Sequence, residues 1–442
     1  MEAPCLRRDL PETLRLRHDL PDATDHDGEA PWADLAAALA RARSARRPGP
    51  DTPTGAQVPA WPGRPSRIPG AEPGRLDLAA LLRLSLAASD ATGRLRPVPS
   101  AGALHPVDAE LAVGPDCSLP PGRYGYDPLR HRVHRLGPQP DGTPPGVTVT
   151  LSVTARRTTS HYGHRAWPLL LLDTGHAAGA LFLAALAMGA GEPEPRLDGP
   201  AAGPLAAVHV PPPTPAPEPT THPFGGPPNP APDPTTHPLG IPPTPTPDPT
   251  THPLGVSPTP RELLARRSTP PPLPGITPTP AALRAVLGTA ARAGGADLRW
   301  CAAVGPPRPA LLEPSPDGTS LRRYAVGEAR PTLAAWAAGQ AWIADAGAVL
   351  LAHGCPADAD AAHIARTHLR AGFAVHLAHV TALRHGLAAR PVGSWQQADL
   401  GAALGAPPGR DWIVHGLALG ALRTHSETAP AALPAAEEKN PA

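Results

Sequence analysis

The sequence has few aromatic residues and almost no net charge. Phe, Trp and Tyr make up 3% of the 442 residues, so an ordinary core has to be built from Ala, Leu and Val. The formal net charge of +1 offers no clustered basic face of the kind that binds nucleic acid. We therefore expect no nucleic-acid partner.

Cysteine is scarce as well. The four cysteines are far apart in the chain and form no CxxC pair; they are Cys5, Cys117, Cys301 and Cys355. This pattern is typical of reduced thiols in a cytosolic protein. It predicts neither a disulfide framework nor a zinc site, and we expect no metal.

Long hydrophobic runs are missing too. The first twenty residues are charged throughout, which argues against a secretory signal. The most apolar stretch, residues 168–190, is interrupted by Asp173, His176 and several glycines, which disfavours a membrane span. We expect a buried helix there, a cytoplasmic location and no membrane partner.

Proline and glycine are abundant instead: 68 and 43 residues, together about a quarter of the chain. Residues 211–275 are of low complexity, and Thr-His-Pro recurs in them every 15 residues, at positions 221, 236 and 251. Proline at this density forbids helix interiors and sheet ladders. The segment is therefore predicted to be a disordered, polyproline-biased linker.

The linker divides the chain into two halves. We predict an N-terminal extension with one helix (1–75), a first domain (76–210), the linker (211–275), a second domain (276–420) and a flexible tail (421–442). Within the first half, Asp77 is a candidate helix cap with Gly93 as terminator. Residues 119–137 carry a β-hairpin signal, 146–155 a strand, and 173–188 a helix that is apolar on nearly all sides.

The second half repeats the first weakly but in the same order. Residues 280–313 echo 78–111, and residues 371–395 echo 174–199. The closing strands, 204–210 and 411–420, also correspond. A duplicated domain whose two copies pack together follows from this order of elements.

The clearest chemical motif is Pro-Ser-Ala-Gly-Ala-Leu-His-Pro at 99–106, preceded by Arg94 and Arg96. Small residues and a glycine let the backbone approach a flat ligand closely. The hydroxyl and N–H groups can bind a carbonyl or phosphate edge, and the arginines suit an anion. Taken alone, such a loop is more often a simple tight turn.

Three segments in this order resemble the SagB/ThcOx-type dehydrogenases of the nitroreductase superfamily. They are Arg96 to Pro106, the hairpin at 119–137, and Ser-His-Tyr-Gly-His-Arg at 160–165 followed by residues 173–189. The resemblance covers residues 60–210 well and 276–420 faintly. Enzymes of this family use FMN to oxidise thiazolines and oxazolines in ribosomally made peptides.

The resemblance implies an α+β, nitroreductase-like fold, with two degenerate copies forming an intrachain pseudo-dimer that holds FMN at its interface. The first copy would contribute Arg96, Pro99, Ser100, Ala101, Gly102 and His105, and the second Pro391, Val392, Gly393 and Ser394. The opposite pairing, residues 303–306 with 197–199, matches the family motifs poorly. We therefore expect one composite flavin site.

Two features depart from the family pattern. The arginine-serine-arginine phosphate grip is not found at its expected place, and Arg64 with Ser66 and Arg67 is a poor substitute. Where azoline-oxidising members carry a lysine-tyrosine pair, this chain has His161 and Tyr162. We predict His161 as general base and Tyr162 as its partner, because histidine can accept a proton near neutral pH. The alternative is that both are polar loop residues.

The implied activity is FMN-dependent dehydrogenation of azolines in a modified precursor peptide, with a cyclodehydratase complex as a further candidate partner. Two alternatives stay open. One is a general NAD(P)H-dependent nitroreductase. The other is a flavin-free, degenerate partner or scaffold of a peptide-modifying complex, which the two departures favour.

Overall fold

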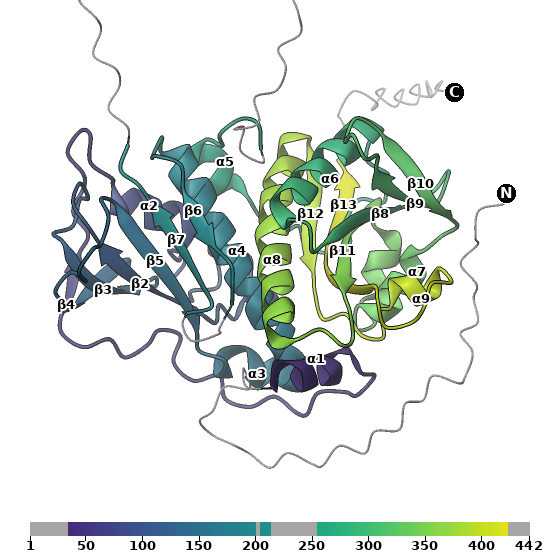
Figure 1. Cartoon of the computed structure of the whole chain (residues 1–442), viewed down its shortest axis with the longest axis horizontal. Helices are drawn as coiled ribbons and strands as arrows, with labels where there is room; N and C mark the ends of the chain where they lie inside the picture. The colour runs from purple at the N-terminus through teal and green to yellow at the C-terminus, as the bar shows by residue number, and fades with distance from the viewer. Residues whose placement is uncertain (1–33, 200–203, 214–253, 423–442) are drawn as a thin grey trace, which may run out of the picture.

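The computed structural model describes residues 34–199, 204–213 and 254–422. Most of the predicted linker, the first 33 residues and nearly all of the predicted tail lie outside the described residues. In Figure 1 the two halves stand side by side, with their long helices α4 and α8 in the middle and a sheet on each outer side.

The first half contains a sheet and four α-helices among its described residues. The helices are α1 (Leu35–Arg43), α2 (Leu78–Ser85), α3 (Arg156–Tyr162) and α4 (Ala166–Ala187). The strands are β1 (Pro65–Arg67), β2 (Val107–Val113), β3 (Gly122–Asp127), β4 (Arg132–Gly137), β5 (Val147–Val153), β6 (Glu194–Arg196) and β7 (Ala206–Val210). The predicted hairpin and the predicted strand at 146–155 are therefore confirmed.

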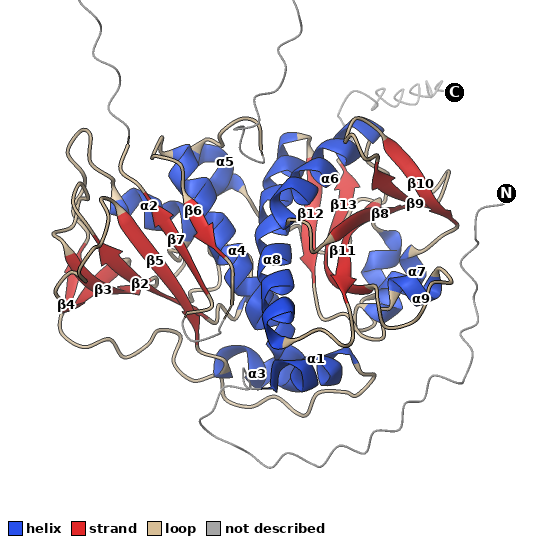
Figure 2. Cartoon of the chain, in the orientation of Figure 1, coloured by secondary structure: helices blue, strands red, loops and turns tan. Residues whose placement is uncertain are grey.

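The second half has the same kind of architecture (Figure 2). Its helices are α5 (Pro260–Ala265), α6 (Pro280–Gly294), α7 (Arg330–Trp336), α8 (Ala361–Arg384) and α9 (Leu400–Ala403). Its strands are β8 (Arg299–Val304), β9 (Ala310–Pro314), β10 (Leu321–Val326), β11 (Ala348–Cys355), β12 (Leu387–Val392) and β13 (Trp412–Ala421).

The strand orders of the two sheets confirm the predicted duplication. The first sheet has the order β1-β4-β3-β2-β5-β7-β6, and the second β10-β9-β8-β11-β13-β12. Apart from the added edge strand β1, each strand has a counterpart in the same place, and the long helix of each half follows the equivalent strand. The fold is α+β, as two copies of one domain within a single chain.

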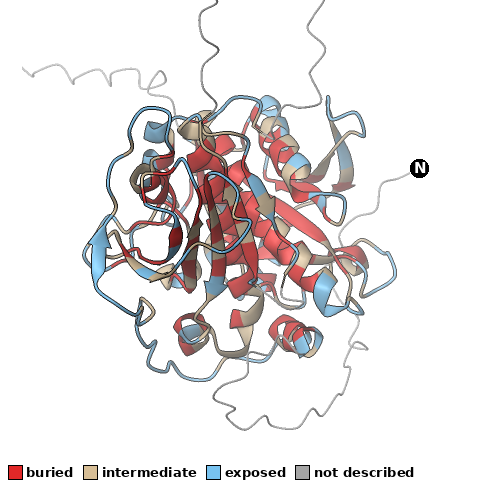
Figure 3. Ribbon diagram, turned by 60° about the vertical axis from the view of Figure 1, so that its left-hand side comes forward, coloured by how far each residue is buried: buried red, intermediate tan, exposed pale blue. Residues whose placement is uncertain are grey.

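The two halves share one continuous core, in which α4 packs along α8. Gly175 on α4 lies against the carbonyl of Leu369, and Gly372 on α8 lies against the carbonyl of Leu172. A side chain at either glycine would collide with the backbone of the opposite helix, so glycine sets how closely the helices approach. Figure 3 shows that buried residues concentrate on these central helices and the strands beside them.

The apolarity of α4 follows from this position. The segment Arg156–Ala187 is the one described stretch long and apolar enough to cross a membrane, and 94% of its most apolar window is buried inside the protein. Burial on all sides explains the lack of a polar face. The predicted buried helix is confirmed, and it begins before the predicted start at 173.

Helix α2 begins as predicted but ends early. The Asp77 carboxylate accepts a hydrogen bond from the N–H of Ala80, which confirms the predicted cap. The helix ends at Ser85 and not near Gly93, because the N–H of Ser89 bonds instead to the carbonyl of Leu95 in a loop. Because α2 ends at Ser85, the chain continues as a loop that brings the Pro-Ser-Ala-Gly turn against α4.

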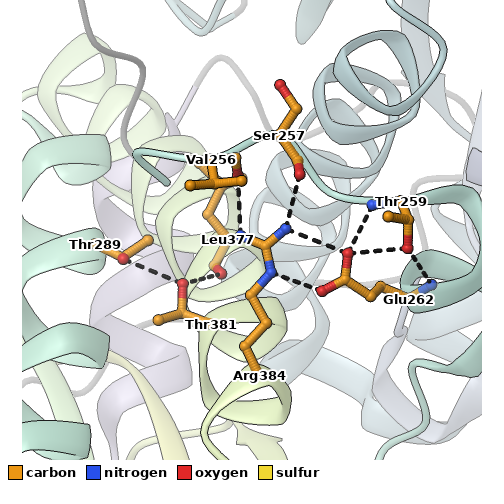
Figure 4. A network of polar contacts seen from close by, with 8 residues as sticks. All are labelled: Val256, Ser257, Thr259, Glu262, Thr289, Leu377, Thr381 and Arg384. Carbon is orange, nitrogen blue, oxygen red and sulfur yellow. Dashed lines mark hydrogen bonds and ion pairs between the residues drawn. The ribbon is translucent and has the colours of Figure 1, made fainter.

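The boundary of the predicted linker needs correction, because residues 254–275 contain helix α5. Thr259 and Glu262 form a capping box at its start, and Pro260 occupies the first helical position. Figure 4 shows how Arg384 on α8 holds this end. Its guanidinium donates to Glu262 at 2.8 Å and to the carbonyls of Val256 and Ser257 at 2.9 and 3.0 Å. Arg384 on α8 thus anchors the start of this segment to the second half.

The N-terminal extension also contains more than the predicted helix. Strand β1 pairs with β4 at the edge of the first sheet. The side chains of Ser66 and Arg67 are exposed there. The substitute phosphate grip considered for Arg64, Ser66 and Arg67 therefore lies on a sheet edge, and none of the three lines the cavity described next.

Candidate functional site

A cavity of about 680 Å³ lies between the two halves. The first half contributes the loop from Arg94 to His105 and one side of α4, and the second half contributes the end of β12 and His415 on β13. A third part of the wall, Arg266 to Ser268, follows α5. Neither half could form this cavity without the other.

The predicted turn of the first half lines the cavity in a strained conformation. Residues Ala101–Ala103 form a short 3₁₀ turn, in which Gly102 and Ala103 have φ of 61° and 54°. Every predicted binding residue of this half reaches the cavity wall: Arg96, Pro99, Ser100, Ala101, Gly102 and His105. Left-handed backbone at a non-glycine residue is unfavourable and is found mainly where a site demands it.

Hydrogen bonds from α4 hold this turn. The Ser100 hydroxyl donates to Asp173 Oδ2 at 2.6 Å, and the N–H of Ala101 donates to the same carboxylate. The N–H of His105 donates to the Ser100 hydroxyl at 3.0 Å, and its ring bonds to the carbonyl of Arg94. Burial lowers the pKa of His105 to about 3, so this imidazole is neutral and serves to brace the loop.

The predicted loop of the second half lies on the same cavity. Pro391, Gly393 and Ser394 line it, so the structure brings them together with Ser100 as the resemblance implied. Val392 does not line the cavity: its side chain packs in the outer core of the second half. Its carbonyl instead accepts a hydrogen bond from His415 Nδ1 at 3.0 Å.

The two residues predicted to be catalytic are separated. Tyr162 lines the cavity, and its hydroxyl lies beside Gly102. His161 does not line the cavity: its Nδ1 lies 3.0 Å from Asp51 Oδ2, and both side chains are more than half exposed. The prediction of His161 as general base is corrected, because the helical turn of α3 that points Tyr162 inward points His161 to solvent.

Among the site residues that sequence reasoning missed, Arg266, Arg267 and Ser268 fell within the predicted linker. Arg266 is 3% exposed and donates from Nε to the carbonyl of Pro97 at 2.7 Å. Burial lowers its pKa to about 10, so the guanidinium keeps its charge at neutral pH. The capping box at Thr259, followed by an apolar turn and two arginines, is the sequence signal that could have located this segment.

The cavity wall is strongly positive. One carboxylate lines it, Asp173, against six arginines: Arg94, Arg96, Arg165, Arg266, Arg267 and Arg390. Within the described residues, none of the six forms an ion pair with a carboxylate. Such an excess of uncompensated charge favours an anionic occupant.

Unpaired polar atoms concentrate in the same wall. Four residues that line the cavity each have a buried nitrogen or oxygen without a hydrogen-bond partner in the described structure: Arg165 Nε, His176 Nδ1, Arg266 Nη1 and Ser394 Oγ. Buried polar groups are nearly always hydrogen-bonded. These four atoms are shielded from solvent as well as unpaired, so they lie within the wall and not on its surface.

Two buried histidines complete the wall, with their tautomers set by their contacts. His415 Nδ1 must donate, because its partner is the carbonyl of Val392. Its Nε2 therefore accepts from His176 Nε2, which lies 2.9 Å away. Burial lowers the pKa of both rings, that of His415 to about 4, so the pair is neutral at pH 7.

The opposite pairing that the sequence disfavours is blocked. The Arg330 guanidinium fills the space where Gly305 lacks a side chain, and it donates to the carbonyl of Ala346. Gly199 lies against Ala365 on α8. Neither glycine lines the cavity, so the described contacts support a single site per chain.

Comparisons with known proteins bear on the fold. No protein-family profile matches the chain, and no curated protein matches it. The structure is similar to that of a candidate nitroreductase from Anabaena variabilis ATCC 29413, with a TM-score of 0.57 and 19% identity, over 78% of this chain and 88% of that one.

Two further solved structures align over less of the chain. One is the E. coli microcin synthetase McbBCD complex with truncated pro-MccB17 bound, at 15% identity over 46% of this chain and 84% of that one. The other is a candidate nitroreductase from Desulfovibrio desulfuricans in complex with FMN, at 19% identity over 41% and 96%. Both have a TM-score of 0.27, too low to carry an argument. The likeness to the Anabaena structure shows a nitroreductase-like fold, and this chain contains two copies of it.

Proposed function

We propose that this protein is an FMN-dependent oxidoreductase that binds one flavin per chain. The observation that carries the proposal is the cavity itself, where the Pro-Ser-Ala-Gly turn of one half meets the Val-Gly-Ser turn of the other. Its volume of about 680 Å³ lies within the range of roughly 300–1,000 Å³ that is typical of cofactor and small-molecule sites.

The residues present fit FMN. Ala101, Gly102 and Gly393 leave room for a flat ring to approach the backbone on the two sides of the interface. Arg266 and Arg267 add positive charge to the wall, which favours the phosphate of FMN. They would take the place of the phosphate grip that the sequence lacks elsewhere. Ser394 lines the cavity beside Gly393.

A bound flavin would supply a two-electron acceptor for a hydride from the substrate. The remaining tasks fall to residues of this chain. The Asp173–Ser100 contact fixes the turn in the cavity wall, and α4 packs against α8 in the core beside it. Tyr162 is placed to orient a substrate by hydrogen bonding.

We further propose that the substrate is an azoline in a ribosomally made peptide, which is oxidised to an azole. The support is the sequence resemblance in residues 96–106, 119–137 and 160–189. A modified precursor peptide, and a cyclodehydratase complex that supplies it, are the partners this activity implies. The flavin-free alternative is less favoured, because the two halves enclose a cavity and arginines line it.

The first test is flavin binding. The purified protein should carry FMN at about one per chain, and Arg266→Gln with Arg267→Gln should weaken its affinity roughly 10- to 100-fold, the loss expected for a charge-assisted contact of about 1.5–3 kcal/mol. The measurement is quenching of flavin fluorescence on titration.

Arg261→Gln is the matched control, since Arg261 is exposed on α5, just before these two arginines, and does not line the cavity. A wild-type protein that binds no FMN, or a double variant with unchanged affinity, would contradict the assignment.

The second test separates the two oxidoreductase reactions. Under anaerobic conditions, an azoline-containing peptide should bleach the bound flavin without nicotinamide, because the ring itself supplies the hydride. NADPH alone should leave the flavin oxidised. The reverse pattern, bleaching by NADPH but not by the peptide, supports a general nitroreductase in place of the azoline dehydrogenase.

A further inference from the structure

Asp173 lies in a wall shared by two cavities. It lines the large cavity between the halves, and it also lines a second cavity of about 20 Å³ behind the turn of the first half. About 10–15 Å³ suffices for one water molecule. Ser100 likewise lines both cavities, so the hydrogen-bonded pair Ser100–Asp173 lies in the wall between the large space and the small one.

The Asp173 carboxyl has few partners for a charged group. Its side chain is 4% exposed and accepts from the Ser100 hydroxyl and from the N–H of Ala101. Within the described residues it forms no ion pair with a cation. Burial therefore raises its pKa to about 7, against the opposing effect of the two donors.

The groups around this carboxyl are neutral or set back from it. Tyr162 faces it from α3, with a pKa raised by burial and then by the charge of Asp173. His105 on the loop and His176 one turn along α4 have lowered pKa values and are neutral. Helix α8 presents backbone at Leu369 and Gly372 to this part of α4, and Arg390 reaches the large cavity from β12.

We propose that Asp173 is the proton acceptor of the site, acting through the Ser100 hydroxyl and releasing the proton into the small cavity. This inference rests on the proposed function and deepens it. A proton leaves the substrate ring carbon to Ser100 Oγ as the Ser100 hydroxyl proton passes to Asp173. The electron pair left on that carbon forms the ring double bond, as the neighbouring carbon releases a hydride to the flavin.

The small cavity provides the way out for the proton. Besides Asp173 and Ser100 its wall includes Arg96, His105 and Asp108, so a water there would have several hydrogen-bond partners. Asparagine keeps one acceptor oxygen, which can take both the Ser100 hydroxyl and the Ala101 N–H at the place of Oδ2, but it cannot take up a proton. The Asp173→Asn variant therefore separates proton transfer from the structural contact.

Infrared spectroscopy on the purified protein tests the proton itself, without any turnover. In the wild type, the carbonyl stretch of a protonated carboxylic acid should disappear as the pH rises through about 7, and Asp173→Asn should lack this signal. The same titrating signal in the variant, or its absence from the wild type, would overturn the proposal. This readout stands even if no flavin is bound, which would be the failure of the proposed function.

Turnover provides the second readout. Asp173→Asn should keep its flavin but lose about 100-fold or more in rate, together with the ionisation near pH 7 in its pH–rate profile. Ser100→Ala should lose rate while the infrared titration persists. If Asp173→Asn fails to fold, the Ser100 variant decides, since an unchanged rate there contradicts the relay.

Discussion

The Gly372→Leu variant is expected to lose most of its stability together with its flavin site. At this position α8 touches the carbonyl of Leu172 on α4, and one turn away Gly175 touches the carbonyl of Leu369. A leucine side chain would therefore meet backbone, which cannot change rotamer to make room. Overpacking a core typically costs about 1–3 kcal/mol, and we expect the upper end or more here.

The effect should be large because the two helices belong to one core. Separating α4 from α8 exposes apolar side chains of both halves and pulls apart the two walls of the cavity. A loss of about 3 kcal/mol or more is a substantial part of the roughly 5–15 kcal/mol that holds a typical domain folded. Urea denaturation and flavin titration of the same sample measure both consequences.

Gly288→Ala is the matched control for this experiment. Gly288 lies within α6, where an added methyl group would meet mainly the flexible end of Arg292. Alanine is favoured over glycine in a helix by about 0.5–1 kcal/mol, so this variant should be as stable as the wild type or slightly more. If Gly372→Leu matched it in stability, the close helix crossing would be wrong.

The second large effect is a loss of folding stability at acidic pH. Seven described histidines are buried: His105, His176, His353, His368, His376, His379 and His415. Burial lowers the pKa of each, to about 3 for His353, His368 and His376. The folded state thus keeps them neutral, whereas an unfolded chain protonates histidine near pH 6.5.

The sign follows from which state binds protons. Above about pH 6.5 these histidines are neutral in both states and stability is full; below it the unfolded state takes up protons that the folded state refuses. Asp173 and Asp108 act in the opposite direction, because their raised pKa values let the folded state bind protons first. A net uptake of protons by the unfolded state remains, and each proton taken up lowers stability by about 1.4 kcal/mol per pH unit.

The protein should therefore unfold roughly one to two pH units below 6.5, well before ordinary carboxylates are protonated. Denaturant midpoints over a pH series, at constant flavin concentration, measure this slope. His376→Leu should reduce the uptake by about one proton. Stability that stays flat down to pH 5 would show that the histidines are not buried as described.

The second half differs from the first around the turn that lines the cavity. Where the first half has the Pro-Ser-Ala-Gly turn, the second copy has the short connection from α6 to β8, and Asp297 in it pairs with Arg366 on α8 at 2.8 Å. Arg330 covers the glycine of the next turn. These two contacts, Asp297–Arg366 and Arg330 over Gly305, distinguish the second half from the first.

The sequence by itself determined the local elements, the duplication and the two cavity turns. Alternation, capping residues and proline breaks act over a few neighbouring residues, so Asp77, the hairpin at 119–137 and the apolar helix could be predicted from them. The repeat order placed Ser100 and Gly393 in equivalent halves, and the family resemblance paired them.

Only the tertiary structure decided which side chains reach the cavity. It turned His161 toward solvent, brought Arg266 and Arg267 from the end of a proline-rich segment, and buried Asp173 against Ser100. Asp173 is 73 positions from its partner Ser100, and Arg266 is 169 positions from its partner Pro97. Their approach depends on how two helices pack across the pseudo-dimer, and no pattern of neighbouring residues encodes that distance.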